Sequence, residues 1–227
     1  MKRILLFGFL LISLQMASAQ NNMVTSAEDS DPKAKAILDQ IRSRFSSYKS
    51  LSADFALDIT FPEQPTETQR GYMAKQGDKF KMAMASQTVI SDGQTLWMIF
   101  DHNKEVQIND MPEETDMGGM ILSPESLLNF YENGDFAYYI TNEYNDGKRT
   151  VQQIEFKPLD SSMEYTKLRM NINKATKDVI SVEAFGRDGS RYKLSLNKLT
   201  PNPSLPASDF TFDKADYPGY YIEDLRM

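Results

Sequence analysis

Side chains able to act as nucleophiles, general bases or metal ligands are scarce in this sequence. Among 227 residues there is one histidine and no cysteine, and His102 lies in a polar stretch between two apolar runs. The sequence has no G-x-S-x-G, H-E-x-x-H or C-x-x-C motif and no phosphate-binding loop, so nucleophile–base pairs and zinc sites lack their parts. Two of the many Asp and Glu residues could act on a glycan only if the fold placed them across a cleft. We therefore expect no enzymatic activity, no cofactor and no metal.

The 13 methionines are the second chemical feature. Their flexible, polarisable side chains can repack around different apolar guests, and they also fill irregular gaps in an ordinary core. Both interpretations stay open for the methionines in or beside the predicted strands and the segment 110–134, which are Met73, Met82, Met84, Met98, Met117, Met120, Met163 and Met170.

The N-terminus has the pattern of an export signal. Lys2 and Arg3 precede an apolar run from Ile4 to Met16, and the following Ala-Ser-Ala fits the small-residue rule for cleavage. The run is too short to span a bilayer as a helix, so we expect a soluble mature protein. We divide the chain into a signal peptide, a polar disordered lead-in and one folded domain, over residues 1–19, 20–30 and 31–227.

The net charge argues against a protein that binds nucleic acid or anionic lipid, and the absence of cysteine argues against a lipid-anchored protein. The formal net charge is −7, and loss of Lys2 and Arg3 with the signal peptide makes it −9, which argues against electrostatic binding of nucleic acid or anionic lipid. Export permits disulfides, so a chain without cysteine relies on its core for stability. The same absence removes the cysteine that lipid anchoring of this chain would need.

A single N-terminal helix precedes a series of strands. Asp31-Pro32 is a helix start, and apolar residues recur at helical spacing up to Tyr48. This predicts an amphipathic helix over 32–49 that covers one face or end of a sheet, with a membrane-active helix as the alternative. From Leu51 to Phe61 apolar and polar residues alternate, which predicts a strand with one wet side. Further strands are predicted over 69–75, 79–85, 136–144, 150–158, 166–172, 179–185 and 191–199.

The stretch from Gln87 to Asn109 predicts three strands joined by tight turns. Asp92-Gly93 and Asp101-His102-Asn103 separate runs of β-forming residues, which is the pattern of an antiparallel meander. The middle run, Thr95 to Phe100, is apolar on both faces, so we expect a central strand covered on both sides. About eleven antiparallel strands in one sheet tend to curl. The sequence therefore predicts a mainly β fold with some α structure, in which helices close the open side of a curled sheet.

Residues 110–134 interrupt the strands. Ser123-Pro124-Glu125 is a helix N-terminus and Gly134 a C-cap, which predicts a helix from Pro124 to Asn133. Its apolar residues occupy most of the circumference of the helix. The helix is therefore either a plug fixed in the core or a lid that moves on the preceding Gly118-Gly119 pair. The sequence leaves both open.

Several segments together resemble the periplasmic outer-membrane lipoprotein carrier family (LolA). They are LSADFALDITF after an amphipathic helix, GYMAKQGDKFKM, SDGQTLWMI after a strand, and the C-terminal FTFDKADYPGYYIED. The resemblance runs from about Ile37 to the end of the chain. It implies an incomplete, half-open antiparallel β-barrel, closed by a helical lid over an apolar cavity that holds the acyl chains of a lipoprotein.

The resemblance implies a monomeric carrier that shuttles acylated lipoproteins through the periplasm to the outer membrane. Its other partners would be an inner-membrane lipoprotein-releasing transporter and an outer-membrane acceptor. Phe80 matches the aromatic residue at the barrel lip that the family links to lipid transfer. An arginine and a proline of some members correspond to Gln76 and Gly77, so a lid contact at Gln76 would lack charge assistance. The one-sided strand faces suggest a cavity and lip, with a sealed core as the alternative, at Phe55, Leu57, Ile59, Phe80, Met82, Met84 and Met98. The resemblance places the lid at Met120 through Asn129, and we expect its apolar residues to be Met120, Leu127, Leu128 and Phe130.

Two other functions stay open at this point. A related half-barrel that binds lipid or peptide can serve as an envelope stress regulator, although a single domain argues against the sensor type. A hydrolase acting on envelope lipid or glycan would need a site that the sequence does not show. A carrier is physically plausible, because a sixteen-carbon chain costs on the order of 12 kcal/mol in water, at about 0.8 kcal/mol per methylene.

Overall fold

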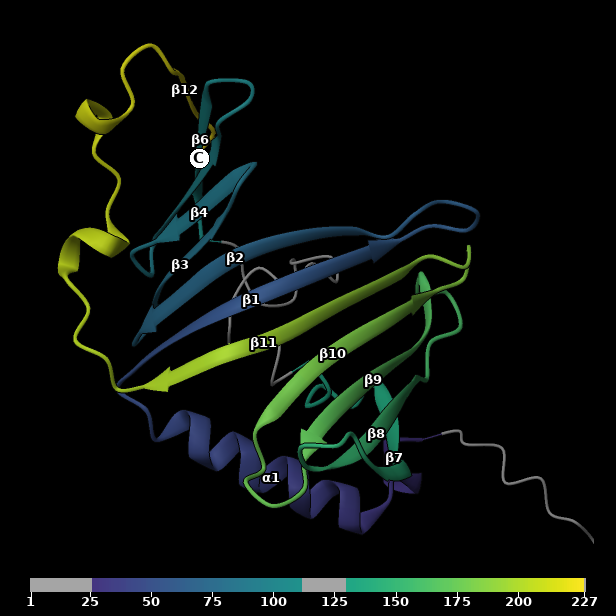
Figure 1. Ribbon diagram of the computed structural model, residues 1–227. Helices are drawn as coiled ribbons and strands as arrows, with labels where there is room; N and C mark the ends of the chain where they lie inside the picture. Colours follow the sequence, from purple (N-terminus) through teal and green to yellow (C-terminus); the bar gives the residue numbers. More distant parts are fainter. Residues whose placement is uncertain (1–25, 112–129, 227) are drawn as a thin grey trace, which may run out of the picture.

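The computed structural model describes residues 26–111 and 130–226, which form one curved sheet and one α-helix (Figure 1). The predicted signal peptide, most of the lead-in and most of the predicted helix over 124–133 lie outside the described residues. The strands are β1 (Ser50–Thr60), β2 (Glu67–Gln76), β3 (Lys79–Met84), β4 (Gln87–Ser91), β5 (Thr95–Phe100), β6 (Glu105–Asp110), β7 (Phe136–Asn145), β8 (Thr150–Pro158), β9 (Tyr165–Asn173), β10 (Val179–Gly186), β11 (Arg191–Pro201) and β12 (Tyr221–Asp224).

Two antiparallel meanders meet at the strand pair β1–β11. The sheet order is β12-β6-β5-β4-β3-β2-β1-β11-β10-β9-β8-β7, so β2 to β6 lie on one side of this pair and β7 to β10 on the other, with β12 added next to β6. Within it, Leu51 pairs with Pro201 and Thr60 with Arg191. In the part of the chain that the structure describes, the two edge strands β7 and β12 do not pair with each other, so the sheet stays open. The prediction of an incomplete barrel is confirmed.

Helix α1 (Pro32–Ser46) packs against one face of the sheet, which we call the inner face. Asp31 caps it by accepting a hydrogen bond from the Lys33 amide at 2.8 Å, as predicted from the Asp-Pro pair. Figure 1 shows α1 running below the β11–β7 half of the sheet. Its buried residues join a core with residues from β1, β2, β3 and β7 to β11. They are Ala34, Ile37, Leu38 and Ile41.

The C-terminal end of α1 is fixed to the β9–β10 turn. The Arg44 guanidinium donates to the Lys177 carbonyl at 3.0 Å and to the Asp178 carboxylate at 2.6 Å. The helix stops at Ser46, three residues before the predicted end at position 49, because the chain must extend to begin β1 at Ser50.

Tight turns form where the sequence predicted them. Between β4 and β5, Asp92 accepts hydrogen bonds from the amides of Gln94 at 2.9 Å and Thr95 at 2.8 Å. Gly93 has a φ of +95°, in the region that favours glycine. The antiparallel meander of β4, β5 and β6 is therefore confirmed.

Strand β5 is covered on both faces, as predicted, but it is not central. It is third from the β12 end of the sheet. Its outer face is covered by the C-terminal segment, where Phe212 stacks on Trp97 with ring centroids 6.3 Å apart. Tyr220 donates its hydroxyl proton to Asp101 at 2.9 Å. The segment carries the short 3-10 helices η3 (Ala207–Phe210) and η4 (Lys214–Asp216), and Figure 1 shows it along the β3–β6 end.

Two expectations were wrong at the ends of the sheet. Strand β12 was not predicted, and it pairs with β6 in parallel, so the sheet is not wholly antiparallel. Residues 26–30 of the expected lead-in are structured, since Ala27–Asp29 form the 3-10 helix η1. Ser30 accepts a hydrogen bond from the Tyr138 amide at 3.1 Å, which holds this segment on β7.

Candidate functional site

The inner face of the sheet carries continuous apolar rows that cross several strands. Because strands alternate their side chains between faces, residues paired across strands share a face. The first row runs Leu57, Leu194, Val182, Met170 and Ile154 from β1 to β8. The second row lies two residues closer to the C-terminal end of β1. It runs Ile59, Tyr192, Ala184, Leu168 and Phe156.

A third row continues the inner face over the β1–β5 half. It places Met82 of β3 and Met98 of β5 on either side of Val89. Beyond Met82 the row passes through Met73 to Ala53. Long, flexible methionine side chains therefore line this part of the sheet in register.

Exposure increases along the inner face of β1. Phe55 is 2% exposed, Leu57 and Ile59 are half-buried, and Phe61 beyond the strand is 40% exposed. The same face is therefore a sealed core near Phe55 and reaches solvent toward Phe61. A plain core strand would be buried along its whole inner face, so this gradient marks the open part of the site.

Gly71 of β2 makes room for the buried Phe55 ring on this face. Gly71 is paired with Phe55, and the Phe55 ring lies across it. A Cβ at position 71 would lie 2.8 Å from Phe55 Cε1, closer still to Cζ, and 2.5 Å from the Ala83 carbonyl oxygen. Only glycine lets the ring pass this close to β2.

The residues predicted for the cavity all lie on the inner face, and six of the seven belong to two clusters. Phe55 and Met82 are buried in the core beneath α1, and Leu57 and Met84 are half-buried against it. Ile59 is half-buried in the second row. Phe80 and the half-buried Met98 belong to a separate cluster with Val89, Leu96 and Met111.

Phe80, which the resemblance places at the barrel lip, is buried. Its side chain is 3% exposed, because Val89, Leu96 and Met111 pack around it. The methionines divide in a similar way. Met73, Met82 and Met170 are core residues, whereas Met84, Met98 and Met163 are half-buried; Met117 and Met120 lie outside the described residues.

Phe130, predicted as a lid residue, packs into an aromatic core cluster. Its ring centroid lies 4.9 Å from that of Phe156 and 5.5 Å from that of Phe136. The neighbouring Glu132 accepts a hydrogen bond from Arg42 of α1, so the chain is tied down here. The predicted C-cap at Gly134 has a φ of +78°. The other predicted lid residues, Met120, Leu127 and Leu128, lie outside the described residues.

Gln76, the predicted lid contact, is an exposed residue at the end of β2. Its strand partners are Ser50 of β1 and Lys79 of β3. The lid residues that it was predicted to contact are not among the described ones, so this contact stays a prediction.

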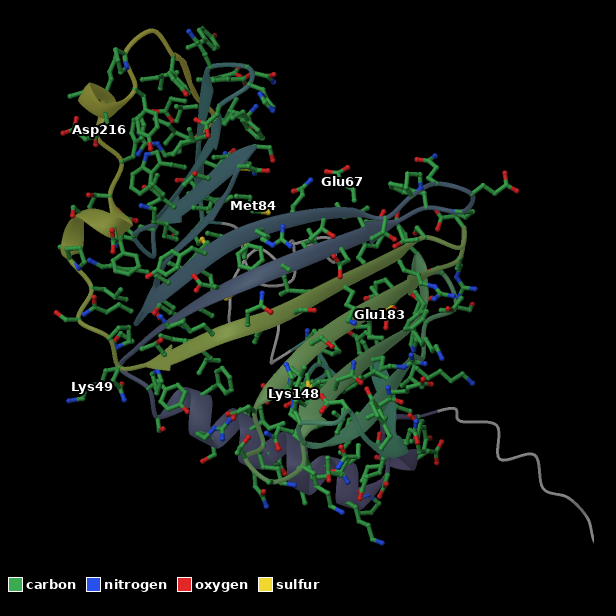
Figure 2. All side chains as sticks on the ribbon, in the orientation of Figure 1. Lys49, Glu67, Met84, Lys148, Glu183 and Asp216 are labelled. Carbon is green, nitrogen blue, oxygen red and sulfur yellow. The ribbon has the colours of Figure 1, made fainter. Side chains whose placement is uncertain are left out.

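The outer face carries a ladder of alternating charges that sequence reasoning missed. Glu155, Arg169, Glu183, Lys193 and Asp58 are successive cross-strand partners from β8 to β1, and Figure 2 labels Glu183. Arg169 lies 2.7 Å from Glu155 and 3.8 Å from Glu183. Burial raises the pKa of the Glu155 carboxyl, but hydrogen bonds from Arg169 and Lys167 outweigh it and hold this pKa below its usual value. From β8 to β1 the sheet therefore has an apolar inner face and a charged outer face.

This arrangement offers contact to apolar groups. In the described ranges, no three His, Cys, Asp or Glu residues are placed to hold a metal ion. His102 is exposed in the β5–β6 turn. None of the helices in the described part of the chain has the length and hydrophobicity needed to cross a lipid bilayer.

An open sheet with an apolar inner face, a charged outer face and a helix across one half defines the class of amphipathic half-barrel proteins. Within this class, the chain belongs to the outer membrane lipoprotein carrier (LolA) family. The family model described as "Outer membrane lipoprotein carrier protein LolA" matches residues 46–213. The chain thus has a lipoprotein-carrier-type fold, in a periplasmic family of carriers rather than catalysts.

The chain is also similar to three individual proteins. An outer-membrane lipoprotein carrier protein from Psychromonas ingrahamii is 23% identical over 224 residues, covering 96% of this chain and 98% of that protein. A crystal structure of an uncharacterized conserved protein from Thermus thermophilus has a TM-score of 0.56 at 10% identity, over 86% of this chain and 99% of that one; it shows the shared fold alone. A LolA superfamily protein from Nitrosomonas europaea has a TM-score of 0.41 at 15% identity, over 80% and 98% of the two chains.

Proposed function

We propose that this protein carries acylated lipoproteins through the periplasm from the inner to the outer membrane. It takes its cargo from an inner-membrane lipoprotein-releasing transporter and passes it to an outer-membrane acceptor. The acyl chains lie against the inner face around Leu57, Ile59 and Met84. The observation that carries the proposal is the change along β1 from the sealed core at Phe55 to the exposed Phe61.

The inner face has the chemistry that such cargo needs. Leu57, Ile59 and Met84 are half-buried apolar residues, so each can lose further solvent contact when a chain lies on it. At about 25 cal/mol per Å² of apolar surface removed from water, a few hundred Å² stabilises the complex by several kcal/mol. Contacts of this kind have little directionality, so a chain can be both held and released.

Co-purification tests the proposal. The protein is isolated from the periplasm, and bound molecules are identified by mass spectrometry. We expect intact lipoproteins with their acyl chains. A regulator would yield free lipid or peptide, a hydrolase would yield cleaved products, and either result, or none bound, contradicts the carrier.

Matched variants on β1 locate the site. Leu57→Asp places a carboxylate on the inner face, so we expect it to lose co-purifying lipoprotein while the melting temperature falls by only a few degrees, because Leu57 is half-buried. The control is Thr60→Asp, whose side chain lies on the outer face opposite Arg191 and should leave binding unchanged. If a folded Leu57→Asp variant retains as much lipoprotein as the wild type, the cargo does not bind to this face.

A further inference from the structure

An exposed aromatic pair lies at the solvent end of the inner face. Phe61 and Tyr192 are each 40% exposed. Their rings are perpendicular, with centroids 6.2 Å apart. A large exposed aromatic pair beside an apolar strip is typical of a surface that binds something.

The pair continues the inner face rather than standing apart from it. Tyr192 is the strand partner of Ile59. Phe61 follows on the same side of the chain as Leu57 and Ile59, because side chains alternate along a strand. A molecule lying on Leu57 and Ile59 therefore leaves the inner face across the Phe61–Tyr192 pair.

Polar groups border the strip at the same end. On β2, Gln69 is paired with Leu57 and Glu67 with Ile59, so both share the inner face. The Gln69 side-chain amide donates to the Glu67 carboxylate at 2.8 Å, and Figure 2 labels Glu67 on β2. Further from this end the same face of β2 carries Gly71 and the buried Met73. The inner face thus changes from apolar to amphipathic along β2 as well as along β1.

We propose that this end of the inner face binds the polar head of the cargo, namely the glyceryl ester and first peptide groups of a lipid-modified amino terminus. This inference rests on the proposed function. It gives a binding site to the part of the lipoprotein that lies outside the acyl-chain site. The aromatic rings contact the glyceryl carbons. The Tyr192 hydroxyl and the Gln69 amide donate to ester and peptide carbonyls, and the Glu67 carboxylate accepts from peptide amides.

The chemistry of the cargo favours this occupant over a plain hydrocarbon chain. Acyl chains have no hydrogen-bonding groups, so they gain nothing from Gln69 and Glu67 and would desolvate them at a cost. The head of an acylated polypeptide is apolar on its glyceryl side and carries carbonyls and amides beside it. It matches a site in which Phe61 and Tyr192 lie next to Gln69 and Glu67.

Photocrosslinking from the site tests the inference. A benzophenone amino acid replaces Phe61 or Tyr192, and the control replaces Tyr144 of β7, which is 41% exposed. Each protein is loaded with a purified triacylated lipoprotein, irradiated and mapped by mass spectrometry. We expect crosslinks from positions 61 and 192 to the first residues of the lipoprotein and none from position 144. Crosslinks from 61 and 192 to acyl carbons, to a second copy of this chain, or to nothing overturn the inference.

Binding measurements separate this inference from the proposed function. For the double variant Phe61→Ser with Tyr192→Ser, we expect the Kd for the lipoprotein to rise about tenfold, and that for a fluorescent palmitate probe to rise much less. Tyr144→Ser should change neither Kd. If the wild type binds neither ligand, the proposed function fails. If it binds both and the double variant, shown folded by its thermal melt, loses them equally or loses neither, the head site fails alone.

Discussion

Gly71→Ala tests how the inner face is packed. The added Cβ would lie 2.5 Å from the Ala83 carbonyl oxygen and 2.8 Å from Phe55 Cε1, so the backbone of β3 and a buried ring must both move. Overpacking of this kind costs about 1–3 kcal/mol, whereas replacing glycine by alanine stabilises by about 0.4–1 kcal/mol through the unfolded chain. Because the new Cβ would meet both a backbone carbonyl and a buried ring, the clash lies at the upper end of its range, and we expect a net loss of about 2 kcal/mol.

Thermal melts and urea titrations measure this loss. For a domain of this size, about 2 kcal/mol corresponds to a fall in melting temperature of roughly 4–8 °C. Phe55→Leu removes the ring atoms that meet the new Cβ but leaves the Ala83 carbonyl in place. The double variant should therefore be more stable than the sum of the two single changes by about 1 kcal/mol, and less stable than the wild type.

A second pairing serves as the control. Ile99 is fully buried in a separate cluster with Ile90 and Val106, so Ile99→Val combined with Gly71→Ala should be additive. A Gly71→Ala protein that melts within about 1 °C of the wild type would refute the steric account. Full additivity between Gly71→Ala and Phe55→Leu would show that the ring is not what the glycine accommodates.

Two further predictions concern the outer face. The pKa of Glu155 is lowered in the folded state relative to 4.5, so its ion pairs contribute stability that is present above pH 4.5 and lost as the pH falls through the folded pKa. The free energy of unfolding should thus fall more between pH 6 and pH 3 in the wild type than in Glu155→Gln, with a difference of about 1 kcal/mol; equal slopes in urea titrations would contradict this. Phe212→Ala removes the ring stacked on Trp97, the chain's only tryptophan, and should shift the fluorescence emission to longer wavelength, whereas Phe185→Ala on β10 should not. An unshifted spectrum for Phe212→Ala would mean that the C-terminal segment does not cover β5 in solution.

Local sequence patterns predicted most of the sheet because strand alternation and tight turns depend on residues that are close together in the sequence. The alternation from Leu51 to Phe61 identified the inner face of β1, and Asp92-Gly93 identified a turn whose geometry requires a positive φ. Strand β12 escaped prediction because Tyr221–Asp224 is short and only Ile222 is a buried-type aliphatic residue. Its strand character comes from pairing with β6, a contact between distant parts of the chain.

The sequence predicted on which face of the sheet the candidate site residues lie, but not how deeply each of them is buried. Alternation placed Phe55, Phe80 and Met82 on one side of their strands, and the structure confirms this side. How deeply Phe80 is buried depends on Leu96 and Met111, which lie on other segments. The charge ladder from Glu155 to Asp58 depends on the register of five strands. A single sequence does not contain that register, because a shift of two residues keeps every side chain on its face.

The pairing of β1 with β11 has a consequence for how the molecule folds. Strands β2 to β6 and β7 to β10 each pair with sequence neighbours, so both meanders can form early from local contacts. β1 can pair with β2 at once, but its other edge must wait for β11, the last long strand of the chain. Contacts between residues so far apart in sequence slow folding. We therefore expect mutations in the β1–β11 pair to change the unfolding rate mainly, and mutations within either meander to change the folding rate.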